Sequence, residues 1–164
     1  ANRTLKVPGN ADGTILTDTY KPVFFARNNN NQSISNSTST KIQFDAEVFD
    51  SHGYYDHSTN YRFTPQLAGY YYITASIYYV NVNNVYAIDI KKNGSRYVNC
   101  DFRHNFAASR SAFISSLVSF NGSSDYVEIF GYHTTGSSIT IGNGTQYSIT
   151  EFSGHFVRAL VWVH

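Results

Sequence analysis

The stretch that decides the fold spans residues 70–80 and reads Tyr70-Tyr71-Tyr72-Ile73-Thr74-Ala75-Ser76-Ile77-Tyr78-Tyr79-Val80. Every odd-numbered position from Tyr71 to Tyr79 is apolar or aromatic, and the polar residues occur only at even-numbered positions. Successive side chains of a β-strand point to opposite faces, so this period of two predicts a strand with its odd positions in the core. We expect residues 70–81 to form the long central strand of a sheet.

The even-numbered face of this strand carries three tyrosines, Tyr70, Tyr72 and Tyr78, where a solvent-facing row would be polar. Tyrosine combines a large contact area with a polar tip, which is typical of subunit interfaces. Alternatively, the rings lie flat on the sheet and protect it. We favour the interface, and we expect a second copy of the chain to cover these rings.

Strand and turn signals continue on both sides of this stretch. Asn-Gly turns occur at Asn93, Asn121 and Asn143, and the first of them predicts a hairpin between residues 85–91 and 96–102. The composition agrees, because 14 Tyr, 12 Phe and 11 Gly in 164 residues fit strands and turns better than helices. The sequence therefore predicts one all-β domain, with a mobile polar loop at 28–39 and further strands at 23–26, 112–120, 125–132, 139–141 and 147–163.

Charge and cysteine content argue against several classes of protein. The net charge of +1 is spread along the chain, without the clustered Lys and Arg that nucleic-acid binding requires. No run approaches the roughly 18 apolar residues of a membrane span. The single Cys100 cannot form an intramolecular disulfide, and we expect it to be a buried small apolar residue. The polar start, Ala1 to Lys6, favours a chain made in a cytoplasm, although a cleaved secretory precursor would look the same.

Several short motifs follow one another in order between Ile42 and Val157. Residues 61–72 contain Phe63-Thr64, then Gly69, then paired aromatics; Asn121-Gly122 precedes Asp125-Tyr126-Val127; and residues 152–156 read Phe152-Ser153-Gly154-His155-Phe156. This series resembles the C1q/TNF-like domain family, which has Phe-Thr before glycine and paired aromatics, then Gly-Asp-x-Val, and a closing Phe-Ser-Gly-Phe. Each motif alone is weak, but their order over about 115 residues is specific.

The resemblance implies a ten-strand jelly-roll sandwich that forms a homotrimer around the sheet holding the central and C-terminal strands. Phe156 and Trp162 thereby join the three tyrosines as candidate interface residues. We place an N-terminal arm or added edge strand at 1–22 and the C1q-like jelly-roll domain at 23–164. We also expect Gly154 to leave a hole that a facing aromatic fills, and Gly69 to begin its strand where a bulkier residue would crowd a turn.

Catalytic patterns are missing from the sequence: there is no Gly-x-Ser-x-Gly elbow, phosphate-cradling loop or His-Glu-x-x-His pattern. Members of the resembled family mainly bind ligands through surface loops, so we expect no enzyme and no cofactor. One cluster could hold calcium or another divalent cation, because it offers four possible ligands within eight positions: Asp50, His52, Asp56 and His57. Alternatively, these residues are family motif positions and exposed histidines without a metal.

We interpret the chain as a virion structural protein, a trimeric capsid decoration or phage fibre module at the virion surface. Its N-terminal arm would dock onto other virion proteins, and its surface could contact the host. One alternative is a receptor- or glycan-binding fibre tip that uses loop aromatics, Tyr54, Tyr55 and Tyr61. The other is a secreted C1q-like recognition protein of an animal, with glycans on some of its Asn-x-Ser/Thr sequons at Asn2, Asn31, Asn36, Asn93, Asn121 and Asn143.

Overall fold

The computed structural model describes residues 21–142 and 150–160, and every regular element in them is a strand. Accordingly, these residues contain no helix that is long and apolar enough to cross a membrane. The eleven strands are β1 (Val23–Arg27), β2 (Gln32–Ile34), β3 (Thr40–Lys41), β4 (Ala46–Asp50), β5 (Tyr55–Asp56), β6 (Arg62–Phe63), β7 (Gly69–Lys92), β8 (Ser95–Phe120), β9 (Val127–His133), β10 (Ile139–Ile141) and β11 (Glu151–Ala159).

Strands β7 and β8 form one antiparallel ribbon of 24 and 26 residues. The predicted turn joins them, with positive φ at both Asn93 (51°) and Gly94 (79°), as a tight hairpin turn requires. The ribbon bends where the pairing shifts register near Asn81 and Asn84, which have φ of 55° and 62°. Asparagine tolerates this left-handed region. The backbone therefore bends without a break. As a result, the strands expected at 70–81 and 85–91 form the single strand β7, and those expected at 96–102 and 112–120 form the single strand β8.

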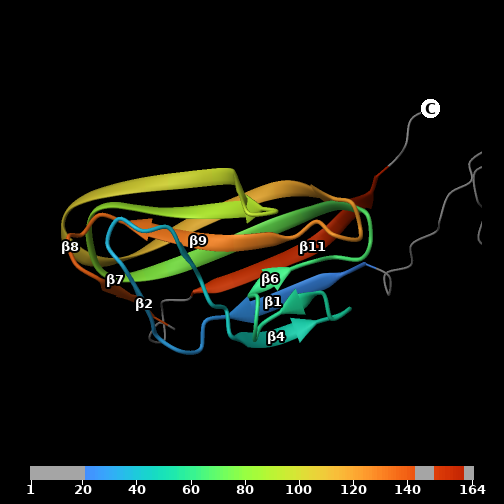
Figure 1. Ribbon diagram of the computed structural model, residues 1–164, viewed down its shortest axis with the longest axis horizontal. Coiled ribbons are helices and arrows are strands. Elements are labelled where there is room, and N and C mark those ends of the chain that lie inside the picture. The colour runs from blue at the N-terminus through green and yellow to red at the C-terminus, as the bar shows by residue number, and fades with distance from the viewer. Residues whose placement is uncertain (1–20, 143–149, 161–164) are drawn as a thin grey trace, which may run out of the picture.

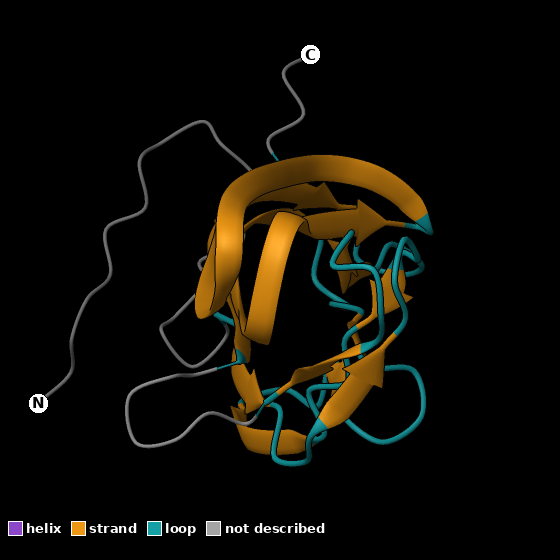
Figure 2. Ribbon diagram, turned by 90° about the vertical axis from the view of Figure 1, so that its left-hand side faces the viewer, coloured by secondary structure: helices purple, strands orange, loops and turns teal. Residues whose placement is uncertain are grey.

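The bend carries the ribbon from one layer of the molecule to the other (Figure 1). In the first layer, the strands follow the order β4-β1-β11-β7-β8, using residues 69–79 of β7. In the second layer, residues 82–92 of β7 lie between β8 and β9, and β9 also pairs with β3 and β6. Figure 2 looks along the strands and shows the layers facing each other. The all-β sandwich is confirmed; its strand count differs from ten because of the joined ribbon and the very short strands.

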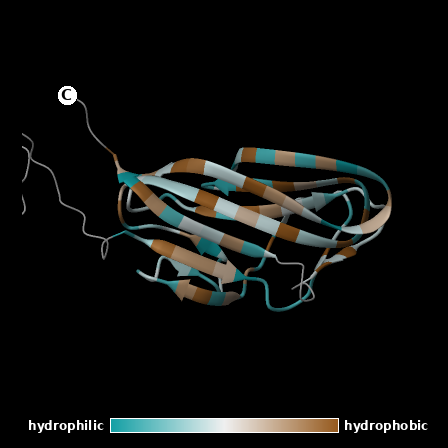
Figure 3. Cartoon of the chain, turned by 180° about the vertical axis from the view of Figure 1, so that it is seen from behind, coloured by the Kyte–Doolittle hydropathy of each residue, from teal (hydrophilic) through white to brown (hydrophobic). Residues whose placement is uncertain are grey.

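The core lies between the layers and contains the odd-numbered row of the opening stretch. Tyr71, Ile73, Ala75, Ile77 and Tyr79 are all buried, as predicted, and the alternation along the strands is visible in Figure 3. At one end of the core, the Phe24 ring stacks on Phe63 with centroids 4.3 Å apart and meets Phe152 edge-on at 4.8 Å. The core is therefore closed by aromatic contacts between strands that are distant in sequence.

Gly154 has the packing role that the sequence predicts, whereas Gly69 is required by its close approach to β11 rather than by a turn. A Cβ on Gly154 would lie 2.8 Å from the Phe24 ring and 2.7 Å from Ile73 Cδ1, so a facing aromatic does fill this space. A Cβ on Gly69 would lie 2.6 Å from the carbonyl oxygen of Arg158. Both positions are too close to neighbouring atoms for any larger residue without displacement of the core.

The polar segment at 28–39 is held by the rest of the chain. It contains β2, which pairs with β10, and Ile34 in this strand is buried. The Ser37 N–H donates to the His133 carbonyl at 2.8 Å, and Asn36 Oδ1 accepts from the Gly136 N–H at 2.7 Å. The expectation of a wholly mobile loop is therefore wrong, because these long-range bonds are not visible in the local composition.

Cys100 and the N-terminal arm were also assigned from sequence. Cys100 is half-buried at the edge of the core opposite Ile88 in β7, so it is less enclosed than we expected. Residues 1–20 of the expected arm lie outside the described residues.

A buried histidine makes stability depend on pH. His133 is fully buried, its Nδ1 accepts a 3.3 Å bond from the Thr135 N–H, and its Nε2 lies 3.3 Å from the Ile34 carbonyl oxygen. An accepting Nδ1 leaves the proton on Nε2, so the ring is neutral and donates to Ile34. Burial lowers the pKa of His133 below its ordinary value, although the bond to Ile34 opposes the shift.

We expect the His133 contribution to stability to be complete above about pH 6.5 and to be lost as the pH falls toward the lower folded-state pKa. The unfolded chain binds the proton first, so acid favours unfolding. The free energy of unfolding, measured with urea at a series of pH values, should therefore change less steeply with pH for His133→Gln than for the wild type. The exposed His57→Gln is the control. Equal slopes for the wild type and His133→Gln would contradict the prediction.

Candidate functional site

The outer surface of the first layer carries exposed apolar side chains on four of its five strands, and Phe25 of the fifth strand, β1, is half-buried. Among the most open are Phe113 at 64%, Leu117 at 48% and Phe49 at 48% exposure. Strand register places Tyr72 between His155 and Leu117, and Phe25 opposite Phe49. We call this surface the outer aromatic face and define it by its apolar members: Phe25, Phe49, Tyr70, Tyr72, Tyr78, Phe113, Leu117 and Val157.

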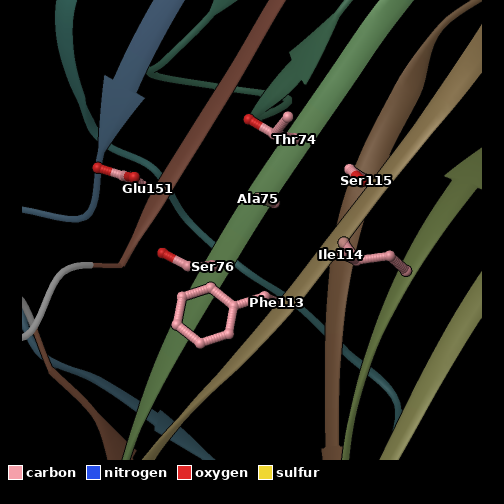
Figure 4. Close-up of a pocket in the computed structure, with 7 residues that line it drawn as sticks. All are labelled: Thr74, Ala75, Ser76, Phe113, Ile114, Ser115 and Glu151. Carbon is pink, nitrogen blue, oxygen red and sulfur yellow. The ribbon is translucent and has the colours of Figure 1, made fainter.

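Two hollows lie on the outer aromatic face, on either side of a polar centre. In that centre the hydroxyls of Thr74 and Ser153 are hydrogen-bonded at 2.8 Å. The first hollow, of about 280 Å³, lies between β7, β8 and β11, and Figure 4 shows the Phe113 ring beside Ser76 at its rim. The second, of about 330 Å³, lies between β1, β4 and β11 and is lined by the Phe25 and Phe49 side chains. The face is therefore uneven as well as apolar.

The outer surface of the second layer is different, because its charges are paired within the chain. Asp89 is buried, and its carboxylate accepts bonds from Arg96 at 3.0 Å and Asn99 at 2.6 Å. The Lys41 ammonium lies 2.6 Å from the buried Glu128 carboxylate. Lys91 Nζ lies 3.6 Å from the centroid of the Phe130 ring. In the described residues, the charges of this layer are paired within the chain, and Tyr97 at 46% and Phe106 near the bend at 63% are its exposed rings, whereas the first layer exposes a larger set of apolar side chains.

Of the interface residues expected from the sequence, three lie on the outer aromatic face and one lies in the core. Tyr70, Tyr72 and Tyr78 lie on the outer aromatic face; Tyr72 is 39% exposed and the other two are half-buried. Phe156 belongs to the core instead, because β11 turns its even positions inward and packs this ring edge-on against Tyr71 at 5.3 Å. Trp162 lies outside the described residues.

Sequence reasoning missed Phe113 and Leu117, although a signal for them exists. In residues 112–120 the buried positions are Ala112, Ile114, Val118 and Phe120, all even-numbered. The odd-numbered Phe113 and Leu117 must then face outward, in the same way as the tyrosines of β7. This second two-sided strand, paired with the first in antiparallel register, is a stronger interface signal than either strand alone.

The loop tyrosines proposed for ligand binding do not form an exposed platform. Tyr55 is 4% exposed, and its hydroxyl donates to the Phe44 carbonyl at 2.9 Å. Burial raises the pKa of Tyr55 well above its ordinary value. Tyr54 is half-buried between His52 and Phe63, and Tyr61 is half-buried with a φ of 51°. The assignment of Tyr55 to a ligand-binding loop is therefore wrong, because the ring completes the core.

The predicted metal cluster is not assembled. The Asp50 carboxylate accepts bonds from its own loop, including the N–H groups of His52 at 3.0 Å and Tyr55 at 2.6 Å. Asp56 does the same in the next loop, and the bonds from the backbone, that of Thr59 foremost, hold its pKa well below the usual range. The described residues contain no group of three or more His, Cys, Asp or Glu placed to hold a metal. These carboxylates shape their loops, and His57 lies beside Glu47 instead.

Comparison with known proteins finds likeness in structure only. No family model matches the sequence, and a search of curated proteins gives no match. The globular domain of zebrafish complement 1qA protein has a TM-score of 0.62 at 13% identity, over 85% of this chain and 99% of that one. Eiger TNF from S. frugiperda gives 0.59 at 9% identity, over 86% of this chain and 94% of that one. PRD1 vertex protein P5 gives 0.55 at 14% identity, over 84% of this chain and 96% of that one.

The molecule is therefore an all-β jelly-roll protein of the C1q/TNF-like fold. At these identities the likeness shows the fold alone. It confirms the resemblance that the ordered motifs indicate, and PRD1 vertex protein P5 is among the structural neighbours.

Proposed function

We propose that this chain is a non-enzymatic structural module that assembles as a homotrimer through the outer aromatic face. One observation carries the proposal: in the described residues, four of the five strands of the first layer carry exposed apolar side chains, while the charges of the second layer are paired within the chain. Contiguous exposed apolar side chains mark interaction sites, and buried aromatics dominate the centres of interfaces. Only the first layer offers such a surface.

The shape of the face favours a closed ring of copies. Phe113 and Leu117 project at the β8 edge, and the hollow lined by Phe25 and Phe49 lies toward the other edge. When a projection on one copy fits a hollow elsewhere on the next, the contact is head-to-tail and closes into a ring if the rotation allows. A ring of three agrees with the family resemblance. Among the described strands, β8 pairs with β7 alone, so its other edge is open. The neighbouring copy in the ring would cover that edge.

The trimer is, in our proposal, a virion module: a capsid decoration or a fibre component, held to other virion proteins by residues 1–22. The likeness to PRD1 vertex protein P5 supports this role. Two sequons argue against a secreted glycoprotein, because their amides are used by the fold. Asn93 Nδ2 donates to Asp125 at 2.8 Å, and Asn121 Nδ2 donates to Ser124 at 2.9 Å.

Two measurements test the proposal. Native mass spectrometry of the purified chain at micromolar concentration should give a mass three times that of the 18.4 kDa chain. A well-folded monomer at that concentration would count against trimer assembly. Mass spectrometry of purified virus particles should detect the chain among the virion proteins. A trimer that is absent from particles but glycosylated on secretion would overturn the virion role.

A further inference from the structure

A polar hollow lies at the bend of the β7–β8 ribbon, away from the outer aromatic face. Its volume is about 400 Å³, and its lining comes from β7, from β8 and from the segment after β9: Asn83, Asn84, His104, Asn105, Thr134 and Thr135. The strands β1 and β11 begin and end, respectively, at the opposite end of the molecule, which Figure 1 shows on the right. The hollow is therefore at the distal end.

The floor of this hollow is fixed by hydrogen bonds between its three segments. The Thr134 N–H donates to the Val85 carbonyl at 2.9 Å, and the Val85 N–H donates to Thr134 Oγ1 at 3.2 Å. The Thr135 hydroxyl donates to the Asn83 carbonyl at 3.3 Å. The backbone is thus satisfied locally, and the site does not depend on a ligand for its shape.

Three side-chain amides remain at the rim. In the described part of the chain, no hydrogen bond engages the amide groups of Asn83, Asn84 or Asn105. Each amide offers two donors and an acceptor, so together they present both kinds of group to one small volume. The φ of 62° at Asn84 belongs to the bend itself, so the fold presents this amide at a rigid position.

An exposed aromatic ring lies beside His104, one of the residues that line the hollow. Phe106 is 63% exposed, and its ring meets His104 edge-on with centroids 4.2 Å apart. His104 is in turn fixed by Arg110, whose guanidinium lies 2.9 Å from Nε2. The open Phe106 ring beside His104, together with the amides of the lining, matches a ligand that has one apolar face and a rim of hydroxyls.

We propose that this hollow binds a carbohydrate, with Asn84 and Asn105 bonded to sugar hydroxyls and Phe106 stacked on the C–H face of the ring. Adjacent hydroxyls of a sugar donate and accept, as the amides do, and a planar aromatic side chain covers the apolar face of a pyranose. The lining is too polar for an apolar ligand, and it contains no carboxylate that would select a metal. The hollow is open, which suits the end of a surface glycan. The site is independent of the proposed trimer and would place a glycan at the end away from β1 and β11.

The test uses the intact chain on a glycan array, followed by saturation-transfer NMR with D-glucose, D-galactose, N-acetyl-D-glucosamine and N-acetylneuraminic acid. We expect at least one glycan class to bind, and we expect Phe106→Ala and Asn84→Gly each to weaken it at least tenfold. Glycine preserves the positive φ at residue 84, so this variant removes only the amide. Tyr97→Ala, which truncates a 46% exposed ring on the same strand but outside both the hollow and the outer aromatic face, should bind as the wild type does.

Failure of this proposal can be distinguished from failure of the trimer, because native mass is measured on the same samples. A wild-type trimer that binds no glycan on the array or in solution overturns the carbohydrate site and leaves the assembly intact. Binding that persists unchanged in both Phe106→Ala and Asn84→Gly also overturns it. Circular dichroism of each variant shows whether the β fold is retained, and a third variant, Asn105→Ala, replaces any that unfolds.

Discussion

Glutamate in place of Phe113 is expected to convert the trimer into monomers at micromolar concentration. Phe113 is 64% exposed in the single chain and lies at the rim of a hollow on the outer aromatic face. Central aromatic anchors of interfaces typically contribute about 2–4 kcal/mol each, and an unpaired charge buried in their place adds a desolvation cost. Sedimentation velocity and light scattering measure the dissociation as a fall in molecular mass.

The matched control for this variant is Phe106→Glu. Both phenylalanines lie in β8 and are almost equally open, with Phe106 at 63% exposure, but Phe106 lies beside His104 of the distal hollow. The control should remain trimeric. If Phe113→Glu also keeps its full mass, or if both variants dissociate, the interface does not lie where we place it.

Truncation of Phe24 should cause the largest loss of stability that a single side chain gives here, about 3–5 kcal/mol. The side chain is fully buried, stacks on Phe63 and Tyr55, and fills the space above Gly154. Alanine would leave a cavity between β1, β6 and β11 that the surrounding rings cannot close. Urea unfolding of Phe24→Ala measures the difference, at one fixed protein concentration because the proposed trimer would contribute to stability.

The same chemical change at an exposed site is the control. Phe106→Ala removes the same ring where most of it is in solvent, so its effect should stay within about 0.5 kcal/mol. Phe24→Leu keeps most of the side-chain volume, so its loss of stability should lie between those of Phe24→Ala and Phe106→Ala. Comparable losses for Phe24→Ala and Phe106→Ala would show that the aromatic cluster is not what closes the core.

The parts of the fold that could be predicted are those with a local cause. The alternation in residues 70–80 requires only the geometry of one strand, and the Asn93-Gly94 hairpin requires only the backbone preferences of two residues. Both predictions are confirmed. The role of Gly154 was also predictable, since a glycine between inward aromatics leaves a space on one face.

The candidate site was less predictable because it depends on contacts between distant segments. Whether Tyr55 is a loop aromatic or a core ring is decided by Phe24 and Phe44. Spacing alone does not show that the Asp50 and Asp56 carboxylates turn back onto their own loops rather than toward a shared ion. The outer aromatic face needs the register of five strands, and only the part on β7 was evident from one stretch.

The position of the bend has a mechanical consequence. Strands β1 and β11 lie side by side with Val23 opposite His155, while the bend near Asn81 and Asn84 is at the far end. A pull between β1 and the distal hollow acts along the strands, so the hydrogen bonds of each ladder, which run across the strands, share the load in shear. A pull that separates the start of β1 from the end of β11 would instead open that ladder one bond at a time. Such a module resists force more strongly along its strands than across them, a difference that single-molecule pulling would measure.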